Sequence, residues 1–361
     1  MNSIARLLCV GTVALASSLG GAIAADTQAI SASDSRIAFD GRFDFSATNA
    51  PTIIWQASRI QFDFDGNTVG LKFEEARGQN FFNAQVDASN SIVAVSEGRQ
   101  PNTVTLAGFG EGRHHLTLFK RSEAKAGTVC FRGIELPAAA SLWPPASATQ
   151  PIKMEFIGDS ITVGACNEDG AEDQWENRRT HNAARSYAAV TAEAFSADYR
   201  NIAVSGMGVV TGWVNITADE IWNRIYPDPS SPREDPKAWV PQVLFVNLGE
   251  NDDSFTRSRH EAFPTNYTRR YVALVHAIRD AWPAAEIVLL RGGMYGGANS
   301  EPLRVAWEST CQQLEADDPR ISHYVFQHWT RNHPRVADDQ AMADELVTWL
   351  KGRQFMAPHR P

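Results

Sequence analysis

The feature that most constrains the fold is a change of periodicity on either side of a proline-rich segment, residues 137–151. This segment holds four prolines among small residues, a composition that favours an extended, semi-rigid connection. Before it, apolar and polar residues alternate with a period of two. After it, short apolar runs alternate with segments of helical spacing. The chain is therefore expected to form two domains of different fold class.

The first domain is expected to be entirely β-structure. Residues 59–64 and 69–74 alternate between apolar and polar side chains, and a turn sequence, Asp65-Gly66-Asn67, separates them. Similar short runs continue to residue 136, as in an antiparallel sandwich or jelly roll. We place this domain at residues 30–138 and the linker at 139–151, where Trp143 is expected to pack against one of the domains.

The second domain, residues 152–355, is expected to be α/β with a mainly parallel sheet, because strands and helices alternate along it. Residues 242–248 are almost continuously apolar, as in a strand covered on both faces. Residues 264–282 form the clearest helix. The pattern predicts further strands at 152–157, 199–204, 286–290 and 323–326, and further helices at 184–197, 302–314 and 336–350.

Residues 1–25 are typical of a cleavable signal peptide. Arg6 supplies the positive start, an apolar stretch follows to Ile23, and Ala22-Ile23-Ala24 has the small-x-small form of a cleavage site. A retained membrane anchor is disfavoured, because small and polar residues interrupt the apolar stretch. We therefore expect a protein that is secreted or periplasmic.

Composition excludes some partners and cofactors. The formal charge of -9 disfavours nucleic acid and anionic membranes as partners. Outside the signal peptide the cysteines are Cys130, Cys166 and Cys311, so at most one intramolecular disulfide is possible, and its pairing stays open. No Cys-x-x-Cys pair indicates a zinc or dithiol site. The oligomeric state also stays open.

Four polar stretches follow predicted strands or precede the last helix, and each could carry chemistry. They are Gly158-Asp159-Ser160, residues 201–206 ending in Ser205-Gly206, Gly249-Glu250-Asn251-Asp252, and Asn332-His333-Pro334. Because the carboxyl ends of parallel strands meet at one edge of the sheet, these stretches are expected to converge there.

Together these stretches could catalyse acyl transfer, which needs a nucleophile, a base and donors for an oxyanion. Ser160 could be the nucleophile and His333 the base. The N–H groups of Ser160 and Gly206, with the amide of Asn251, could bind the oxyanion. This chemistry needs no metal and no organic cofactor.

The order of these blocks resembles the SGNH (GDSL) hydrolase superfamily, over about residues 152–355. The sandwich, the linker and the sequence Phe-Ile-Gly-Asp-Ser-Ile-Thr at 156–162 make the chain most similar to carbohydrate esterase family 2. This resemblance implies an esterase that removes O-acetyl groups from plant polysaccharides. The substrates it implies are acetylxylan, acetylated glucomannan and 6-O-acetyl hexoses.

Two positions depart from the superfamily pattern. The Asp that usually lies three residues before the histidine is replaced by Thr330. By similarity to family 2, we expect a Ser-His dyad, in which a backbone carbonyl holds the imidazole of His333. Glu250 replaces a residue that is usually small, and we expect its carboxylate to point away from the oxyanion site. Asp338 and Asp339 are expected to cap the last helix.

Tyr295, Trp213 and Trp329 lie near the predicted active edge and could stack on a sugar ring. Alternatively, each ring could serve packing alone. Two alternative functions also stay open: a lipase-like or thioesterase-like hydrolase of the same superfamily, and a catalytically weak protein that binds carbohydrate through its sandwich. The sandwich could instead complete one wall of the site.

Overall fold

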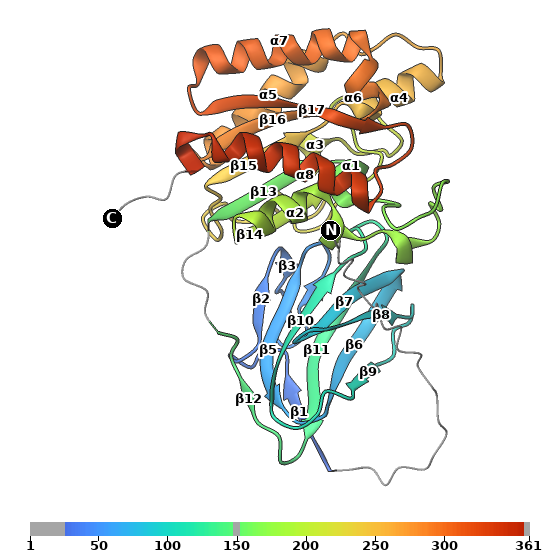
Figure 1. Cartoon of the computed structure of the whole chain (residues 1–361), viewed down its shortest axis with the longest axis vertical. Coiled ribbons are helices and arrows are strands. Elements are labelled where there is room, and N and C mark those ends of the chain that lie inside the picture. The colour runs from blue at the N-terminus through green and yellow to red at the C-terminus, as the bar shows by residue number, and fades with distance from the viewer. Residues whose placement is uncertain (1–25, 147–151, 357–361) are drawn as a thin grey trace, which may run out of the picture.

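The computed structural model describes residues 26–146 and 152–356, so the predicted signal peptide lies outside the described residues. Figure 1 shows a β-domain below an α/β-domain. Among the described residues, no helix combines the length and the apolar character needed to cross a membrane. All three described cysteines are free thiols.

The first domain is a sandwich of two antiparallel sheets. Apolar side chains of both sheets, including Phe62, Phe73 and Phe131, form one core between them. The first sheet contains, in spatial order, β3 (Phe43–Asp44), β4 (Thr52–Ile53), β11 (Gly127–Pro137), β6 (Thr68–Gly78) and β9 (Asn102–Ala107), with β1 (Thr27–Ser31) also on β11. The second contains β12 (Leu142–Trp143), β5 (Arg59–Asp65), β10 (Arg113–Lys120), β7 (Asn80–Val86) and β8 (Ser89–Val95), with β2 (Ala38–Asp40) also on β5.

The segment predicted as a linker contains the short strand β12, which pairs with β5. Trp143 lies on this strand, and the Arg113 guanidinium lies 4.7 Å from the centre of its ring. The first part of the segment is therefore fixed to the sandwich, and residues 147–151 are outside the described residues.

The second domain is built on one parallel sheet. Its strands lie in the order β14 (Asp198–Ala203), β13 (Lys153–Gly158), β15 (Val243–Asn247), β16 (Glu286–Met294) and β17 (Ile321–Thr330). The helices are α1 (Ser160–Val163), α2 (Tyr187–Ala194), α3 (Ala218–Ile221), α4 (Glu250–Ser258), α5 (Tyr267–Ala281), α6 (Tyr295–Asn299), α7 (Glu301–Asp317) and α8 (Val336–Lys351). Short 3₁₀ turns span Arg178–Thr180, Ala183–Arg185 and Gln354–Met356.

Helices cover both faces of this sheet, α5 and α7 on one side and α2 and α8 on the other (Figure 1). Each predicted strand and helix of this domain has a counterpart in the structure, although the ends differ by several residues at some elements. Helix α4 was not predicted, because its polar sequence has little apolar periodicity. The chain therefore contains an antiparallel β-domain followed by a parallel α/β-domain.

Candidate active site

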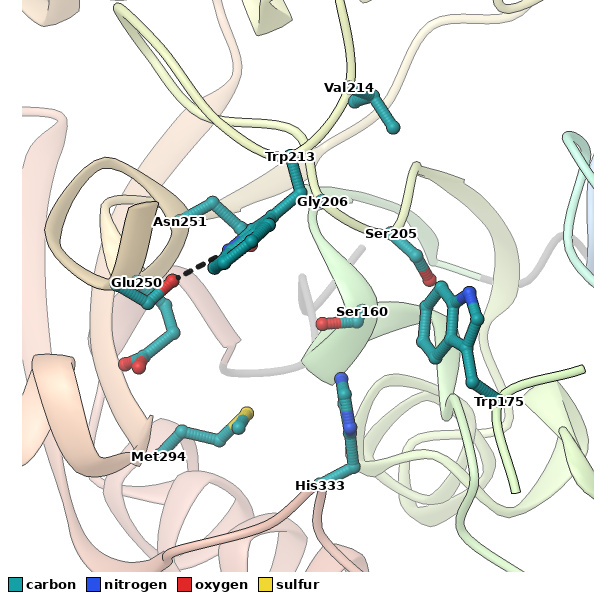
Figure 2. A pocket seen from close by; sticks show the side chains of 11 residues that line it. Ser160, Trp175, Ser205, Gly206, Trp213, Val214, Glu250, Asn251, Met294 and His333 are labelled. Atoms are coloured by element: carbon teal, nitrogen blue, oxygen red, sulfur yellow. Dashed lines mark hydrogen bonds between the residues drawn. The ribbon is translucent and has the colours of Figure 1, made fainter. Parts of the chain in front are cut away.

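One pocket of about 420 Å³ brings the four sequence blocks together (Figure 2). The lining residues come from the sheet edge and from loops far apart in sequence: Ser160, Trp175, Ser205, Gly206, Trp213, Val214, Glu250, Asn251, Ser254, Met294 and His333. The predicted nucleophile, base and oxyanion donors all belong to this set.

Ser160 is the first residue of α1, directly after the end of β13. Asp159 caps this short helix, and its Oδ1 accepts a hydrogen bond of 3.0 Å from the N–H of Ile161. Such a strand-to-helix turn presents the serine at the sheet edge. Figure 2 shows the Ser160 side chain inside the pocket, with a ring nitrogen of His333 directed toward it.

His333 is held by a carboxylate that the sequence did not suggest. Its Nδ1 lies 2.6 Å from Oδ2 of Asp173, and the Asp173 Oδ1 lies 2.8 Å from Nη1 of Arg335. This arrangement corrects the expected dyad, in which a backbone carbonyl would hold the imidazole. Thr330 instead donates its hydroxyl to the carbonyl of Asn332 at 2.6 Å.

The ionised form of Asp173 is strongly favoured. Burial alone would raise the pKa of this carboxyl, but the hydrogen bonds and charges of His333 and Arg335 lower it to about 2. A carboxylate in this position fixes the imidazole tautomer with a free Nε2 and stabilises the ring when it becomes positive. Sequence reasoning missed Asp173 because it lies 160 positions from His333, in a loop without periodicity.

Gly206 and Ser160 provide two open backbone donors. In the described residues, neither N–H donates to another protein group. Gly206 has φ of 82°, and a Cβ there would come within 3.1 Å of the Trp213 Cβ, so the position requires glycine. Both donors are therefore available for an oxyanion on a carbon bound to Ser160.

Asn251 lies in the first turn of α4, and its amide already has partners. Nδ2 is 3.0 Å from Oδ2 of Asp159 and 3.0 Å from the carbonyl of Met207. An oxyanion would therefore be a third acceptor at this nitrogen. Burial raises the pKa of Asp159 to about 8, although the N–H of Ile161 opposes the shift. The Asp159–Asn251 contact joins the first and third sequence blocks.

Glu250 points away from the oxyanion donors, as expected. Its carboxylate oxygens accept the N–H groups of Gly296 and Gly297 at 3.0 and 2.7 Å, at the start of α6. Burial raises its pKa, and these two hydrogen bonds oppose the rise. Figure 2 shows the carboxylate directed away from Ser160.

The capping prediction for α8 is correct for one of its two residues. Asp338 Oδ2 accepts the Arg335 N–H at 2.8 Å, which closes a capping box. Asp339 is buried and instead accepts the N–H of Tyr187 at 2.9 Å. Asp339 therefore links α8 to the start of α2 and does not cap α8.

The three predicted aromatic contacts separate into two places. Trp213 lines the pocket with 57% of its surface exposed, and its Nε1 donates to Ser254 Oγ at 3.0 Å (dashed in Figure 2). Tyr295 and Trp329 do not line this pocket, and their ring centres lie 6.2 Å apart. Trp175, which the sequence analysis did not select, forms the opposite wall and stacks on His333 at 5.5 Å with an interplanar angle of 30°.

In the described part of the chain, one group of side chains offers metal-ligand atoms within 4.8 Å of one another: Cys166, Asp173 and His333. Burial raises the pKa of the Cys166 thiol, which favours its neutral form. Asp173 is already paired with His333 and with the fixed positive charge of Arg335. The geometry therefore suits an acid–base pair better than a metal site.

Known proteins resemble this chain over both domains. A sequence model of the carbohydrate esterase 2 N-terminal domain matches residues 39–145, and one of the GDSL-like lipase/acylhydrolase family matches residues 156–344. The chain is 32% identical over 344 residues to the cellulase/esterase CelE of Acetivibrio thermocellus, a match that covers 91% of this chain and 41% of that longer protein. It is 28% identical over 332 residues to an acetylxylan esterase / glucomannan deacetylase of Cellvibrio japonicus, covering 86% and 88%.

Solved structures give the same result. A family two carbohydrate esterase from Clostridium thermocellum in complex with cellohexaose is 31% identical, with a TM-score of 0.77 over 87% of this chain and 98% of that one. A family two carbohydrate esterase from Cellvibrio japonicus shares the fold, with a TM-score of 0.80 at 24% identity over 92% and 98% of the two chains. The chain thus belongs to the GDSL-like hydrolases and, within them, to family 2 of the carbohydrate esterases.

Proposed function

We propose that this protein removes O-acetyl groups from the sugars of plant polysaccharides, by a serine esterase mechanism. The observation that carries the proposal is the 2.6 Å contact of Asp173 with His333, a residue that lines the same pocket as Ser160. Thr330 occupies the position of the usual acid, and the lack of a carboxylate there would weaken catalysis. Asp173 supplies a carboxylate to His333 from another loop instead.

In the proposed reaction, Ser160 Oγ attacks the acetyl carbonyl carbon while Nε2 of His333 takes the hydroxyl proton. The carbonyl oxygen becomes an oxyanion and accepts the N–H groups of Ser160 and Gly206, together with Asn251. The bond from carbon to the sugar oxygen then breaks, and His333 protonates that oxygen. Water, deprotonated by His333, attacks the acetyl-serine, and acetate leaves as Ser160 regains its proton.

The aromatic walls of the pocket support a substrate that contains a sugar ring. Trp175 and Trp213 line the pocket on opposite sides of Ser160 (Figure 2). Indole faces suit the apolar face of a sugar ring. The names of the relatives, acetylxylan esterase / glucomannan deacetylase, point to the same substrate class.

The direct test is acetate release from acetylated xylan, acetylated glucomannan and 6-O-acetyl hexosides, with wild type beside Ser160→Ala. We expect release by the wild type and none by the variant. Faster hydrolysis of octanoyl than of acetyl nitrophenyl esters would instead support a lipase-like or thioesterase-like enzyme. Sugar binding without any labelling of Ser160 by a phosphonate ester would support a carbohydrate-binding role.

We also propose that the enzyme is exported, on the basis of the signal-like residues 1–25. Amino-terminal sequencing of the protein recovered from periplasm and medium tests this proposal. We expect the mature chain to begin at Ala25 or Asp26. A mature protein that keeps Met1 would refute it.

A further inference from the structure

Glu123 belongs to the sandwich domain, yet its carboxylate contacts two segments that build the catalytic pocket. It lies between β10 and β11 and is 2% exposed. Oε2 accepts the N–H of Ser205 at 3.0 Å, and Oε1 accepts Nη1 of Arg178 at 3.0 Å. Hydrogen bonds to an ionised carboxylate are short and strong, so one buried group fixes both partners.

The first contact lies next to the oxyanion donor. Ser205 lines the pocket and directly precedes Gly206, and the peptide unit between them carries the Gly206 N–H. The positive φ of Gly206 gives this turn a specific shape. By holding the Ser205 N–H, Glu123 fixes the direction in which the chain enters the turn.

The second contact leads to the wall behind the base. The guanidinium of Arg178 lies 4.4 Å from the centre of the Trp175 ring, a cation–π contact. Trp175 in turn stacks on the imidazole of His333. Glu123 therefore fixes Arg178, and Arg178 supports the Trp175 ring. Trp175 in turn limits the tilt of the His333 imidazole.

Other sandwich residues hold the same loop. Gln79 Nε2 donates to the carbonyl of Glu176 at 3.0 Å, and its Oε1 accepts the N–H of Arg178 at 3.3 Å. Arg121 pairs with Glu168. The segment 164–182, which carries both Asp173 and Trp175, is thus attached to the first domain on both sides of these residues.

We propose that Glu123 is a positioning residue for the esterase reaction, through which the sandwich domain sets the oxyanion turn and the aromatic wall beside His333. The inference rests on the proposed function, because it assigns a part in that reaction to a residue outside the catalytic domain. It makes the sandwich part of the active site, in addition to any binding of polysaccharide.

The test compares Glu123→Ala and Glu123→Gln with a control at the same domain interface, Arg59→Ala. Arg59 pairs with Asp198 at 2.7 Å, at the amino end of β14 and outside the catalytic pocket. The measurements are kcat and KM for 4-nitrophenyl acetate, the rate at which a fluorophosphonate labels Ser160, and the melting temperature of each variant.

We expect Glu123→Ala to lower kcat by about 10²-fold, the scale of an ångström of misplacement, with KM changed less than about threefold. Glu123→Gln keeps the shape of the side chain but presents an N–H₂ group to one of the two donors, Ser205 N–H or Arg178. We therefore expect kcat to fall by about tenfold. Labelling of Ser160 should slow in parallel, because the phosphonate passes through a state that uses the same donors. Arg59→Ala should keep the wild-type kcat and labelling rate.

Wild-type kcat and labelling in both Glu123 variants, with a lower melting temperature as the single change, would overturn the inference. If Glu123→Ala does not fold, Glu123→Gln and Arg178→Ala provide the test. We expect the fluorophosphonate to label Ser160 more slowly in both variants than in the wild type. If the wild type cleaves no acetyl ester but Ser160 still reacts with the fluorophosphonate, the proposed function is wrong. The role of Glu123 can then still be tested by comparing the labelling rates of the variants. An unreactive Ser160 in the wild type would overturn both.

Discussion

At the scale of single residues, Asp173 has the clearest consequences. Its carboxylate lies between His333 Nδ1 at 2.6 Å and Arg335 Nη1 at 2.8 Å, so it stays ionised and cannot turn without losing both partners. Arg335 also donates to the carbonyls of Gly170 and Cys166, which fixes the guanidinium to the same loop. Asp173, His333, Arg335 and the loop therefore form one connected unit.

Asp173→Asn should lower kcat for acetyl esters by up to about 10⁴-fold, because an amide can hold the wrong imidazole tautomer. The adjacent exposed carboxylate offers a matched control, Glu172→Gln, which should keep the wild-type kcat. A loss below tenfold in Asp173→Asn would show that the acid is dispensable.

Asn251→Ala should lower kcat by about 10²–10³ if its amide binds the oxyanion. The amide already contacts Asp159 and the carbonyl of Met207, so the same change also tests a purely structural role. Unaltered kcat with reduced stability would assign Asn251 to structure alone. Steady-state kinetics and thermal melting on one preparation separate the two results.

At the scale of elements, buried carboxylates fasten the loops at the carboxyl edge of the sheet. Asp252, in the first turn of α4, accepts the N–H groups of Val209, Val210 and Thr211 at 2.7 to 3.1 Å. This contact fixes the loop between Gly206 and Trp213. Helix α4 therefore orients three site loops, through Glu250, Asn251 and Asp252.

The loop 164–182 should make stability depend on pH through His181, which is fully buried against Cys166 and Trp175. Burial, together with the charge of Arg178, lowers the pKa of His181 to about 3. The unfolded value is about 6.5, so between these values the unfolded chain binds the extra proton. The stability contribution is complete above about pH 6.5 and is lost as pH falls toward 3.

Urea unfolding at pH 7 and pH 5 measures this effect. Between pH 7 and pH 5 the wild type should lose about 2 kcal/mol through His181, because the loss runs at about 1.4 kcal/mol per pH unit only below about pH 6.5. His181→Asn should lack this loss. The exposed His260 gives the control, and His260→Gln should keep the wild-type slope. Equal slopes in wild type and His181→Asn would contradict the assignment.

At the scale of the whole molecule, charged groups are buried where the two domains meet. Arg42 of the sandwich is 1% exposed, and its guanidinium lies 2.7 Å from Glu234 and 3.5 Å from Glu155 of β13. It also donates to the carbonyl of Trp222 at 2.8 Å. The interface is therefore a fixed junction rather than a flexible connection.

Arg42→Leu should lower the free energy of unfolding by about 3–5 kcal/mol, because it leaves Glu155 buried without its partner. Arg36→Ala removes the surface pair with Asp34 and should cost less than about 1 kcal/mol. Urea denaturation of both variants checks the comparison. A similar small loss in both would mean that the junction gains little from the buried charges.

The local sequence by itself determined the two fold classes, most elements, and four of the residues that line the pocket. Period-two alternation and apolar strands are local patterns, and the blocks around Ser160, Gly206, Asn251 and His333 are short motifs in a set order. Only the tertiary structure shows that Asp173 contacts His333 and that Trp175 forms a wall of the pocket. Asp173 and Trp175 lie in a loop whose course depends on contacts with Gln79, Arg121 and Glu123 of the other domain, at sequence separations that no local pattern records.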